Sequence, residues 1–293
     1  MVGIARARRA GYCVIPPIWE YGGSGPVIHI APANGFPPAT YLPLFEGLRR
    51  DHRIVCIPPR ALRGLGPPPA KAGSWESVAD DLVAGWEAHH LAPVIAVGHS
   101  FGAVSSLLAS IRARRLVRAL VLLDPTIREP RVMAQAAAAK KAHGEVRFHL
   151  VDTALRRRTL FETRDSAFTY WRRRRLFHDW SDEALQRYAD AMLRPAPEGH
   201  GFTLEWPAEW ETWYYRSFYP GTWDDIPQLD QSLPLLIIGG ETSDTLSAES
   251  AARLREMLPR ATHVTLPGAG HLFPQSHPAE TRAILERWLA GLS

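Results

Sequence analysis

The sequence of 293 residues is poor in cysteine and has no long hydrophobic run. Its two cysteines, Cys13 and Cys56, form neither a disulfide framework nor the spacing of a metal site, and Cys56 reads as a small buried hydrophobe. No apolar stretch approaches the roughly 18 residues of a membrane span. The basic N-terminal segment lacks the apolar region of a signal peptide. We therefore expect no membrane partner, no metal, no organic cofactor and a reducing, cytoplasmic location.

The sequence also lacks a large cluster of charges of one sign. The formal net charge is +4, but the cations are scattered, and only Arg156–Arg158 and Arg172–Arg175 form basic runs. This distribution favours solvated arginines on helix surfaces, so we expect no nucleic-acid partner. The length and the 46% hydrophobic content allow a large core, in one large domain or two small ones.

Short aliphatic runs alternate with longer helical stretches along the chain. This alternation predicts βαβ units and a mostly parallel sheet with helices on both faces. The stretch 11–23 could add an antiparallel pair at one edge. The predicted strands are 26–31, 53–59, 93–99, 118–124, 233–240 and 262–268, and the clearest predicted helices are 74–90, 247–258 and 278–292.

The strand spacing stops between residues 126 and 228. This stretch is helical in pattern and rich in aromatic residues, and an unstructured loop of that length would be unusual. We therefore predict a helical insertion at 126–228, and a core domain made of residues 1–125 and 229–293.

The motif that carries chemistry is Gly98-His99-Ser100-Phe101-Gly102, which fits G-x-S-x-G. It follows a predicted buried strand and opens a predicted helix, which is the strand–turn–helix context that the motif needs. Small residues must flank a serine at such a sharp turn, and the helix N-terminus beneath it favours negative charge. Ser100 is therefore the predicted nucleophile.

A serine nucleophile needs a general base, and His271 lies in the loop between the last predicted strand and the last predicted helix. That loop opens at the carboxyl edge of the sheet, where α/β proteins bind ligands. His99, next to the serine, reads as structural. The acid that orients the base is either Asp244, in the turn after the strand 233–240, or Asp124, at the end of the strand 118–124. We favour Asp244 because it closes the turn after the next-to-last predicted strand, and the chain order is then Ser, Asp, His, as this architecture requires.

An oxyanion hole requires two backbone N–H groups. Phe101, directly after the nucleophile, supplies one. The loop after the strand 26–31 contains Asn34-Gly35-Phe36, and the N–H of Phe36 is the predicted second donor. A simple Asn-Gly turn without a role in catalysis is the alternative.

The segments NGFP, GHSFG and GAGH, in this order, resemble those of the α/β-hydrolase superfamily, particularly its capped esterase, lactonase and dehalogenase-like branches. The resemblance implies an α/β-hydrolase fold with a cap, or lid, inserted after the sixth strand, which matches the helical insertion. Asn34 stands where members usually have histidine. In the similar haloalkane dehalogenase and epoxide hydrolase branches, aspartate stands at the position of Ser100. The serine therefore argues against these two branches.

These observations predict a serine hydrolase that cleaves small or medium apolar esters through an acyl-enzyme, as a monomer or a homodimer. The alternatives are a lactonase, a C–C bond hydrolase or an acyltransferase with the same triad, or a ligand-binding receptor with vestigial turnover. From the aromatic residues of the insertion we select Trp210, Trp213 and Tyr214 as substrate-binding, although packing is the simpler interpretation of any one of them. The run Arg172–Arg175 could steer an anionic substrate, but a solvated face is the simpler interpretation.

Overall fold

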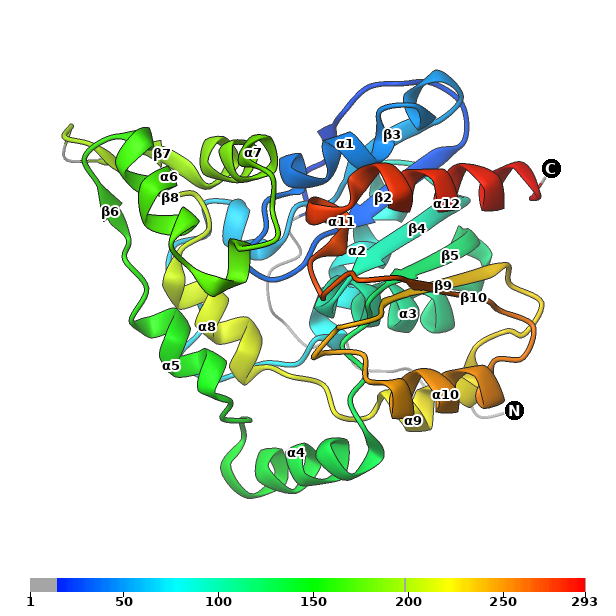
Figure 1. The fold of residues 1–293 in the computed structure, drawn as a ribbon. Helices are drawn as coiled ribbons and strands as arrows, with labels where there is room; N and C mark the ends of the chain where they lie inside the picture. The colour runs from blue at the N-terminus through cyan, green and yellow to red at the C-terminus, as the bar shows by residue number, and fades with distance from the viewer. Residues whose placement is uncertain (1–14, 198, 293) are drawn as a thin grey trace.

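The computed structural model describes residues 15–197 and 199–292, and its centre is a twisted seven-stranded sheet (Figure 1). All neighbouring strands are parallel except β1, which is antiparallel to β3. This arrangement confirms the predicted α/β class. In spatial order the strands are β1 Trp19–Glu20, β3 Arg53–Cys56, β2 Val27–Ala31, β4 Val94–His99, β5 Val117–Leu123, β9 Leu235–Gly240 and β10 Thr262–Leu266.

The central strands are buried on both faces, because helices cover each side of the sheet. Every residue of β4 is buried, which explains its nearly continuous apolar run. In Figure 1, one face carries α1 (Leu42–Phe45) and α12 (Pro278–Ala290). The other face carries α3 (Phe101–Arg112), which packs against α2 (Glu76–Ala88), and α10 (Ala248–Met257).

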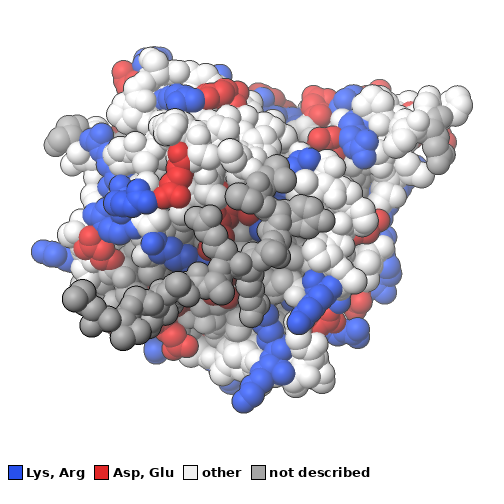
Figure 2. Space-filling view, turned by 180° about the vertical axis from the view of Figure 1, so that it is seen from behind, with Lys and Arg blue, Asp and Glu red and all other residues white. Residues whose placement is uncertain are grey.

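At the edge of the sheet, the stretch 11–23 contributes one short strand, β1, within the described residues. Cys13 and the rest of residues 11–14 lie outside them. Cys56 is fully buried in β3. On the face shown in Figure 2, basic and acidic groups are intermixed. Many of the arginines are ion-paired, as Arg112 is with Glu76 and Asp80.

The residues between β5 and β9 form a body beside the carboxyl ends of the central strands (Figure 1). In the described chain this insertion follows the fifth strand. It also contains a small antiparallel sheet, β6-β8-β7, that the sequence did not predict, because strands of two or three residues leave no period-2 pattern. Its elements are α4 Pro130–His143, α5 His149–Leu155, β6 Leu160–Phe161, α6 Arg164–Arg172, α7 Asp182–Met192, β7 Leu193–Pro195, β8 Phe202–Leu204, α8 Ala208–Arg216 and α9 Thr222–Asp225.

Candidate active site

Ser100 occupies a strained turn between β4 and α3. Its backbone angles are φ 59° and ψ −122°, a region that costs a residue with a side chain about 1–3 kcal/mol. The two glycines of the motif permit this turn. A Cβ on Gly98 would lie 2.5 Å from the carbonyl oxygen of Gly102, and a Cβ on Gly102 would overlap the carbonyl oxygen of Ala31. The turn holds the hydroxyl of Ser100 above the N-terminus of α3.

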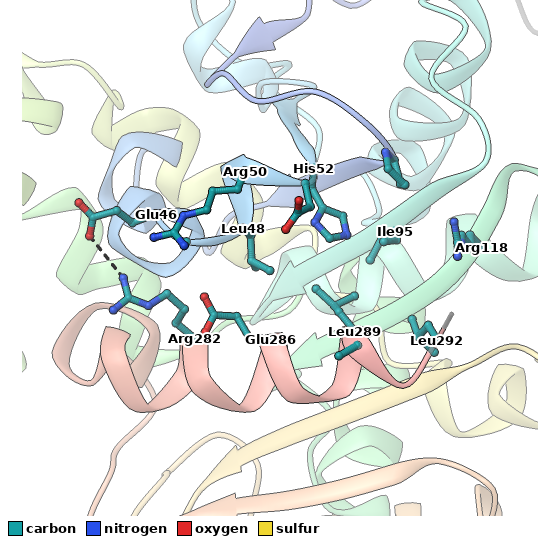
Figure 3. Close-up of a pocket in the computed structure, with 14 residues that line it drawn as sticks. Glu46, Leu48, Arg50, His52, Ile95, Arg118, Arg282, Glu286, Leu289 and Leu292 are labelled. Carbon is teal, nitrogen blue, oxygen red and sulfur yellow. Dashed lines mark hydrogen bonds and ion pairs between the residues drawn. The ribbon is translucent and has the colours of Figure 1, made fainter.

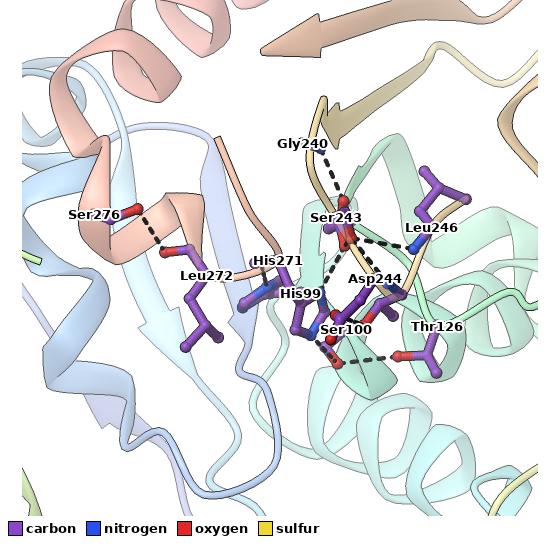
Figure 4. Close-up of polar contacts among 12 residues, drawn as sticks. His99, Ser100, Thr126, Gly240, Ser243, Asp244, Leu246, His271, Leu272 and Ser276 are labelled. Atoms are coloured by element: carbon purple, nitrogen blue, oxygen red, sulfur yellow. Dashed lines mark hydrogen bonds and ion pairs between the residues drawn. The ribbon is translucent and has the colours of Figure 1, made fainter. Parts of the chain in front are cut away.

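His271 lies in the loop after β10, and its imidazole faces Ser100 (Figure 4). Its Nε2 is 3.0 Å from Ser100 Oγ, and its Nδ1 is 2.6 Å from Oδ2 of Asp124. Asp124, the first residue after β5, is completely buried. Its carboxylate also accepts hydrogen bonds from the backbone N–H of Gly240 at 2.9 Å and from the hydroxyl of Ser243 at 2.5 Å. The carboxylate is thus held by three donors, one of which is His271.

The expectation that Asp244 contacts His271 is wrong. The Asp244 side chain is exposed, and its hydrogen-bond partner is the neighbouring Thr245 at 3.2 Å. The physical reason lies in the sheet order. Because β5 is the direct neighbour of β4, the residue after β5 emerges beside Ser100, whereas the turn after β9 starts one strand further away. From that turn Ser243, which the sequence analysis missed, reaches inward to Asp124.

Thr126 is a second residue that the sequence analysis missed. Its Oγ1 is 3.0 Å from Ser100 Oγ. When Ser100 donates its proton to His271, the hydroxyl of Thr126 must be the donor in this second contact, because a serine hydroxyl has one proton. The sequence feature that could have identified Thr126 is its position, two residues after Asp124 at the carboxyl end of a central strand.

The two predicted oxyanion donors differ in their surroundings. The Phe101 N–H is the first of α3 and has no acceptor among the described residues, as expected at a helix N-terminus. The Phe36 N–H closes a turn on the carbonyl oxygen of Ala33 at 3.2 Å, with Gly35 at φ 82°. Phe36 can therefore serve a second acceptor only by sharing its proton.

His99 links the loop of His271 to Tyr41 and, through Tyr41, to the loop that contains Ala33. Its Nε2 is 3.0 Å from the carbonyl oxygen of His271, so that nitrogen carries the proton, and its Nδ1 accepts the hydroxyl proton of Tyr41 at 2.6 Å. The oxygen of Tyr41 in turn accepts the N–H of Ala33 at 2.9 Å. Burial and the nearby His271 hold the pKa of His99 well below its ordinary value. His99 is thus a neutral bridge in the interior.

Two completely buried histidines should make the fold sensitive to acid. Burial also lowers the pKa of His29, which accepts the N–H of Ile57, to about 3. Both His29 and His99 are neutral in the folded state but titrate near pH 6.5 once unfolded. The contribution of His29 to stability is therefore complete above about pH 6.5 and is lost as the pH falls toward 3, and that of His99 is lost in the same direction. We expect His29 to cost about 2 kcal/mol of unfolding free energy between about pH 7 and pH 5.

Urea unfolding at both pH values checks this expectation. The variant His29→Gln should lose about 2 kcal/mol less than the parent protein on acidification. The same change at the exposed His178 is the matched control for the substitution itself. An equal loss of unfolding free energy in the parent and in His29→Gln would show that His29 is not a source of the acid sensitivity.

A cavity of about 750 Å³ opens at Ser100 and His271, between the core and the insertion. The predicted substrate-binding residues Trp210, Trp213 and Tyr214 do not line it, so that prediction is wrong. All three are buried on the face of α8 toward the core. The indole N–H groups of Trp210 and Trp213 donate to the carbonyl oxygens of Gly66 at 2.7 Å and Lys71 at 3.1 Å.

The cavity receives instead the other face of the same helical segment, with Glu211, Tyr215 and Phe218. Glu211 and Tyr215, four apart, share one side of α8, while Trp210 and Trp213, three apart, share another. The remaining walls are largely aromatic, and they include Phe36, Trp75, Phe101, Phe148, Tyr170, Trp171, Phe177 and Tyr188.

A second cavity, of about 840 Å³, lies at the opposite ends of the strands (Figure 3). It is lined by residues that precede β2 and β3, such as Pro26 and His52, and by Arg282 of α12, which pairs with Glu46 at 3.3 Å. Since the sheet is parallel, this cavity is separated from Ser100 by the length of the strands. It takes no part in the arrangement around the serine.

Within residues 15–197 and 199–292, no cluster of three histidine, cysteine or acidic side chains is placed to bind a metal ion. In the same part of the chain, no helix has the length and apolar character to cross a membrane.

Comparison with known proteins identifies the architecture. A family model described as "Alpha/beta hydrolase family" matches residues 27–284. A comparison with curated proteins gave no match. Among solved structures, E-2-(acetamidomethylene)succinate hydrolase is similar at a TM-score of 0.74, with 22% identity over 93% of this chain and 94% of that one. An esterase of M. tuberculosis is similar at 0.70, with 20% identity over 93% and 88%. An esterase from Thermogutta terrifontis gives 0.62, with 19% identity over 94% and 93%. At these identities the likeness shows the fold.

Proposed function

Because the chain belongs to the α/β-hydrolase family, we propose that it is a serine hydrolase which cleaves carboxylic esters through an acyl-enzyme intermediate. The observation that carries the proposal is the hydrogen-bonded series Ser100–His271–Asp124 at the cavity. Serine, a base within 3.0 Å and a buried carboxylate behind the base are what nucleophilic catalysis on a carbonyl carbon requires.

In the first step His271 Nε2 takes the proton of Ser100 while Oγ attacks the ester carbonyl carbon. Asp124 holds the proton on Nδ1, which leaves Nε2 free to accept, and it stabilises the imidazolium that forms. The Phe101 N–H, with that of Phe36 as the second donor, stabilises the oxyanion. The tetrahedral intermediate collapses when His271 returns the proton to the leaving alcohol.

Water then enters, and His271 removes its proton as it attacks the acyl-enzyme, releasing the carboxylic acid and free Ser100. We propose that the insertion 126–228 acts as a cap over this reaction. Its aromatic side chains form much of the cavity wall, which restricts bulk water and holds the apolar part of the ester. The hydroxyl of Thr126 would steady Oγ as negative charge develops on it.

Hydrolysis of p-nitrophenyl acetate, butyrate, octanoate and laurate tests the proposal. We expect a burst of p-nitrophenol equal to the enzyme concentration, since acylation releases the phenol before water cleaves the acyl-enzyme. Absence of turnover on every ester would contradict the ester assignment. Turnover of lactones or C–C substrates alone would then identify the alternative hydrolases, and binding without turnover would identify a receptor.

A further inference from the structure

The cavity at Ser100 has basic walls as well as aromatic ones. Five arginines line it, against two acidic residues, Glu211 and Asp244. The arginines are Arg128, Arg156, Arg157, Arg158 and Arg174. A pocket for a purely apolar ester has no need of this excess of positive charge, since desolvating charged groups costs free energy.

The deepest of these arginines, Arg157, is largely compensated. It pairs with Glu211 beside the loop of Gly35, and its Nη2 donates to Tyr188 at 3.0 Å. Burial alone would lower the pKa of Arg157, but Tyr188 and Glu211 raise it above its ordinary value. Arg157 therefore stays cationic, and Glu211 offsets its charge.

Of the four arginines nearer the solvent, Arg128 pairs with Glu129 at 3.5 Å, whereas the other three have no such compensation. Arg174 lies over the ring of Tyr170, 4.1 Å from its centroid, and Arg158 lies 5.7 Å from the same centroid. Among the described residues, no carboxylate lies within 4.0 Å of Arg156, Arg158 or Arg174. Arg158 lies closer to the ring of Phe161, at 4.8 Å, and its Nε–H donates to the carbonyl oxygen of Leu160 at 2.8 Å. The aromatic rings thus fix two cations at the cavity, while the terminal N–H groups of Arg158 and those of Arg174 stay available to a ligand.

Arg172 shows the contrast within the same run. It pairs with Asp182 at 2.9 Å and donates to the carbonyl oxygens of Phe177 and Trp180, so it holds the insertion together and does not line the cavity. Arg174, two residues further on, faces the cavity and has no acidic partner.

We propose that the substrate is an ester whose acyl chain ends in a carboxylate, and that Arg174 and Arg158, with Arg156 beside them, bind this carboxylate while the ester group lies at Ser100. This deepens the proposed function and rests on it. The aromatic walls hold the apolar chain between the two polar ends. Guanidinium groups bind carboxylates through paired, charge-assisted hydrogen bonds, which fix the orientation of the chain as well as its affinity.

Two esters of equal length test the inference, p-nitrophenyl hemiglutarate and p-nitrophenyl pentanoate. We expect kcat/KM to be at least about tenfold higher for the hemiglutarate at low ionic strength. The advantage should shrink in about 0.5 M salt, because exposed charges are screened there. Equal kcat/KM for the two esters would overturn the inference and leave the proposed esterase function intact.

Arg174→Gln and Arg158→Gln should each lower the ratio of kcat/KM for the hemiglutarate to kcat/KM for the pentanoate about three- to tenfold. Arg173→Gln and Arg175→Gln are matched controls, because both residues are exposed in the same run and neither lines the cavity. An equal loss in the controls would show that general surface charge is responsible and would overturn the site.

Calorimetry separates failure of the site from failure of the reaction. Should the protein hydrolyse no ester, glutarate binding that weakens in Arg174→Gln but not in Arg175→Gln would support the anion site, while the proposed function would fall. Equal binding of glutarate and pentanoate, or no binding of glutarate, would overturn the site.

Discussion

Replacing Asp124 by asparagine should lower kcat for ester hydrolysis by about 10⁴-fold, whereas Asp244→Asn should change it less than about threefold. Asparagine cannot accept the Nδ1–H of His271 in the geometry that keeps Nε2 unprotonated. The imidazole is then held in the wrong tautomer, and the imidazolium loses its counter-charge. No hydrogen bond joins Asp244 to His271, and the exposed carboxylate of Asp244 accepts the hydroxyl proton of Thr245.

The measurement is the steady-state rate on p-nitrophenyl butyrate, with a thermal melt of each variant. The melt is needed because the amide introduced by Asp124→Asn would meet two donors, the N–H of Gly240 and the hydroxyl of Ser243. That mismatch should cost about 1–3 kcal/mol of stability, so the assay is run well below the melting temperature. A large loss in Asp244→Asn together with a small one in Asp124→Asn would refute the Ser100–His271–Asp124 arrangement.

Ser100→Ala should lower kcat about 10⁵-fold or more and abolish covalent labelling by a fluorophosphonate. Without Oγ no acyl-enzyme forms, and only the oxyanion donors and the shape of the cavity can act on the ester. Mass spectrometry of the intact protein reports the label, and p-nitrophenol release reports the rate.

Thr126→Ser is the matched control for this second prediction. It keeps a hydroxyl at 3.0 Å from Ser100 Oγ, so both labelling and turnover should persist within about tenfold. Labelling of the Ser100→Ala protein at the parent stoichiometry would mean that another residue is the nucleophile.

The parts of the molecule that could be predicted from sequence are those set by short-range patterns. The apolar runs of β4 and β5 specify buried parallel strands. The motif around Ser100 specifies its turn, because only small residues fit at Gly98 and Gly102. The place of His271 follows from the alternation of strand and helix at the end of the chain.

The choice between Asp124 and Asp244 depends on sheet order, which no local pattern contains. Both residues follow a strand at the same edge of the sheet. β5 lies directly beside β4, which brings Asp124 to His271, whereas β9 is one strand further away. From the turn after β9, Ser243 and not Asp244 points inward.

The error over the aromatic residues of α8 has a similar origin. Large apolar or aromatic side chains occur on both faces of that helix, so its pattern does not show which face meets the cavity. Trp210 and Trp213 face the core because their indole N–H groups donate to the carbonyl oxygens of Gly66 and Lys71, which are far away in the sequence. Glu211, an acidic side chain between the aromatic residues Trp210 and Trp213, was the available sign that another face of the helix meets a polar space.

The adjacency of β4 and β5 makes the molecule modular. Ser100 and Asp124 are aligned by one strand pair, in which His99 lies beside Leu123, and both residues precede the insertion in the chain. We expect an exchange of the proposed cap for that of a homologue, in evolution or by grafting, to leave these two residues aligned. Under the proposed function, the inheritance of bond cleavage and the inheritance of substrate choice are in this way separable, with Thr126 at the junction between them.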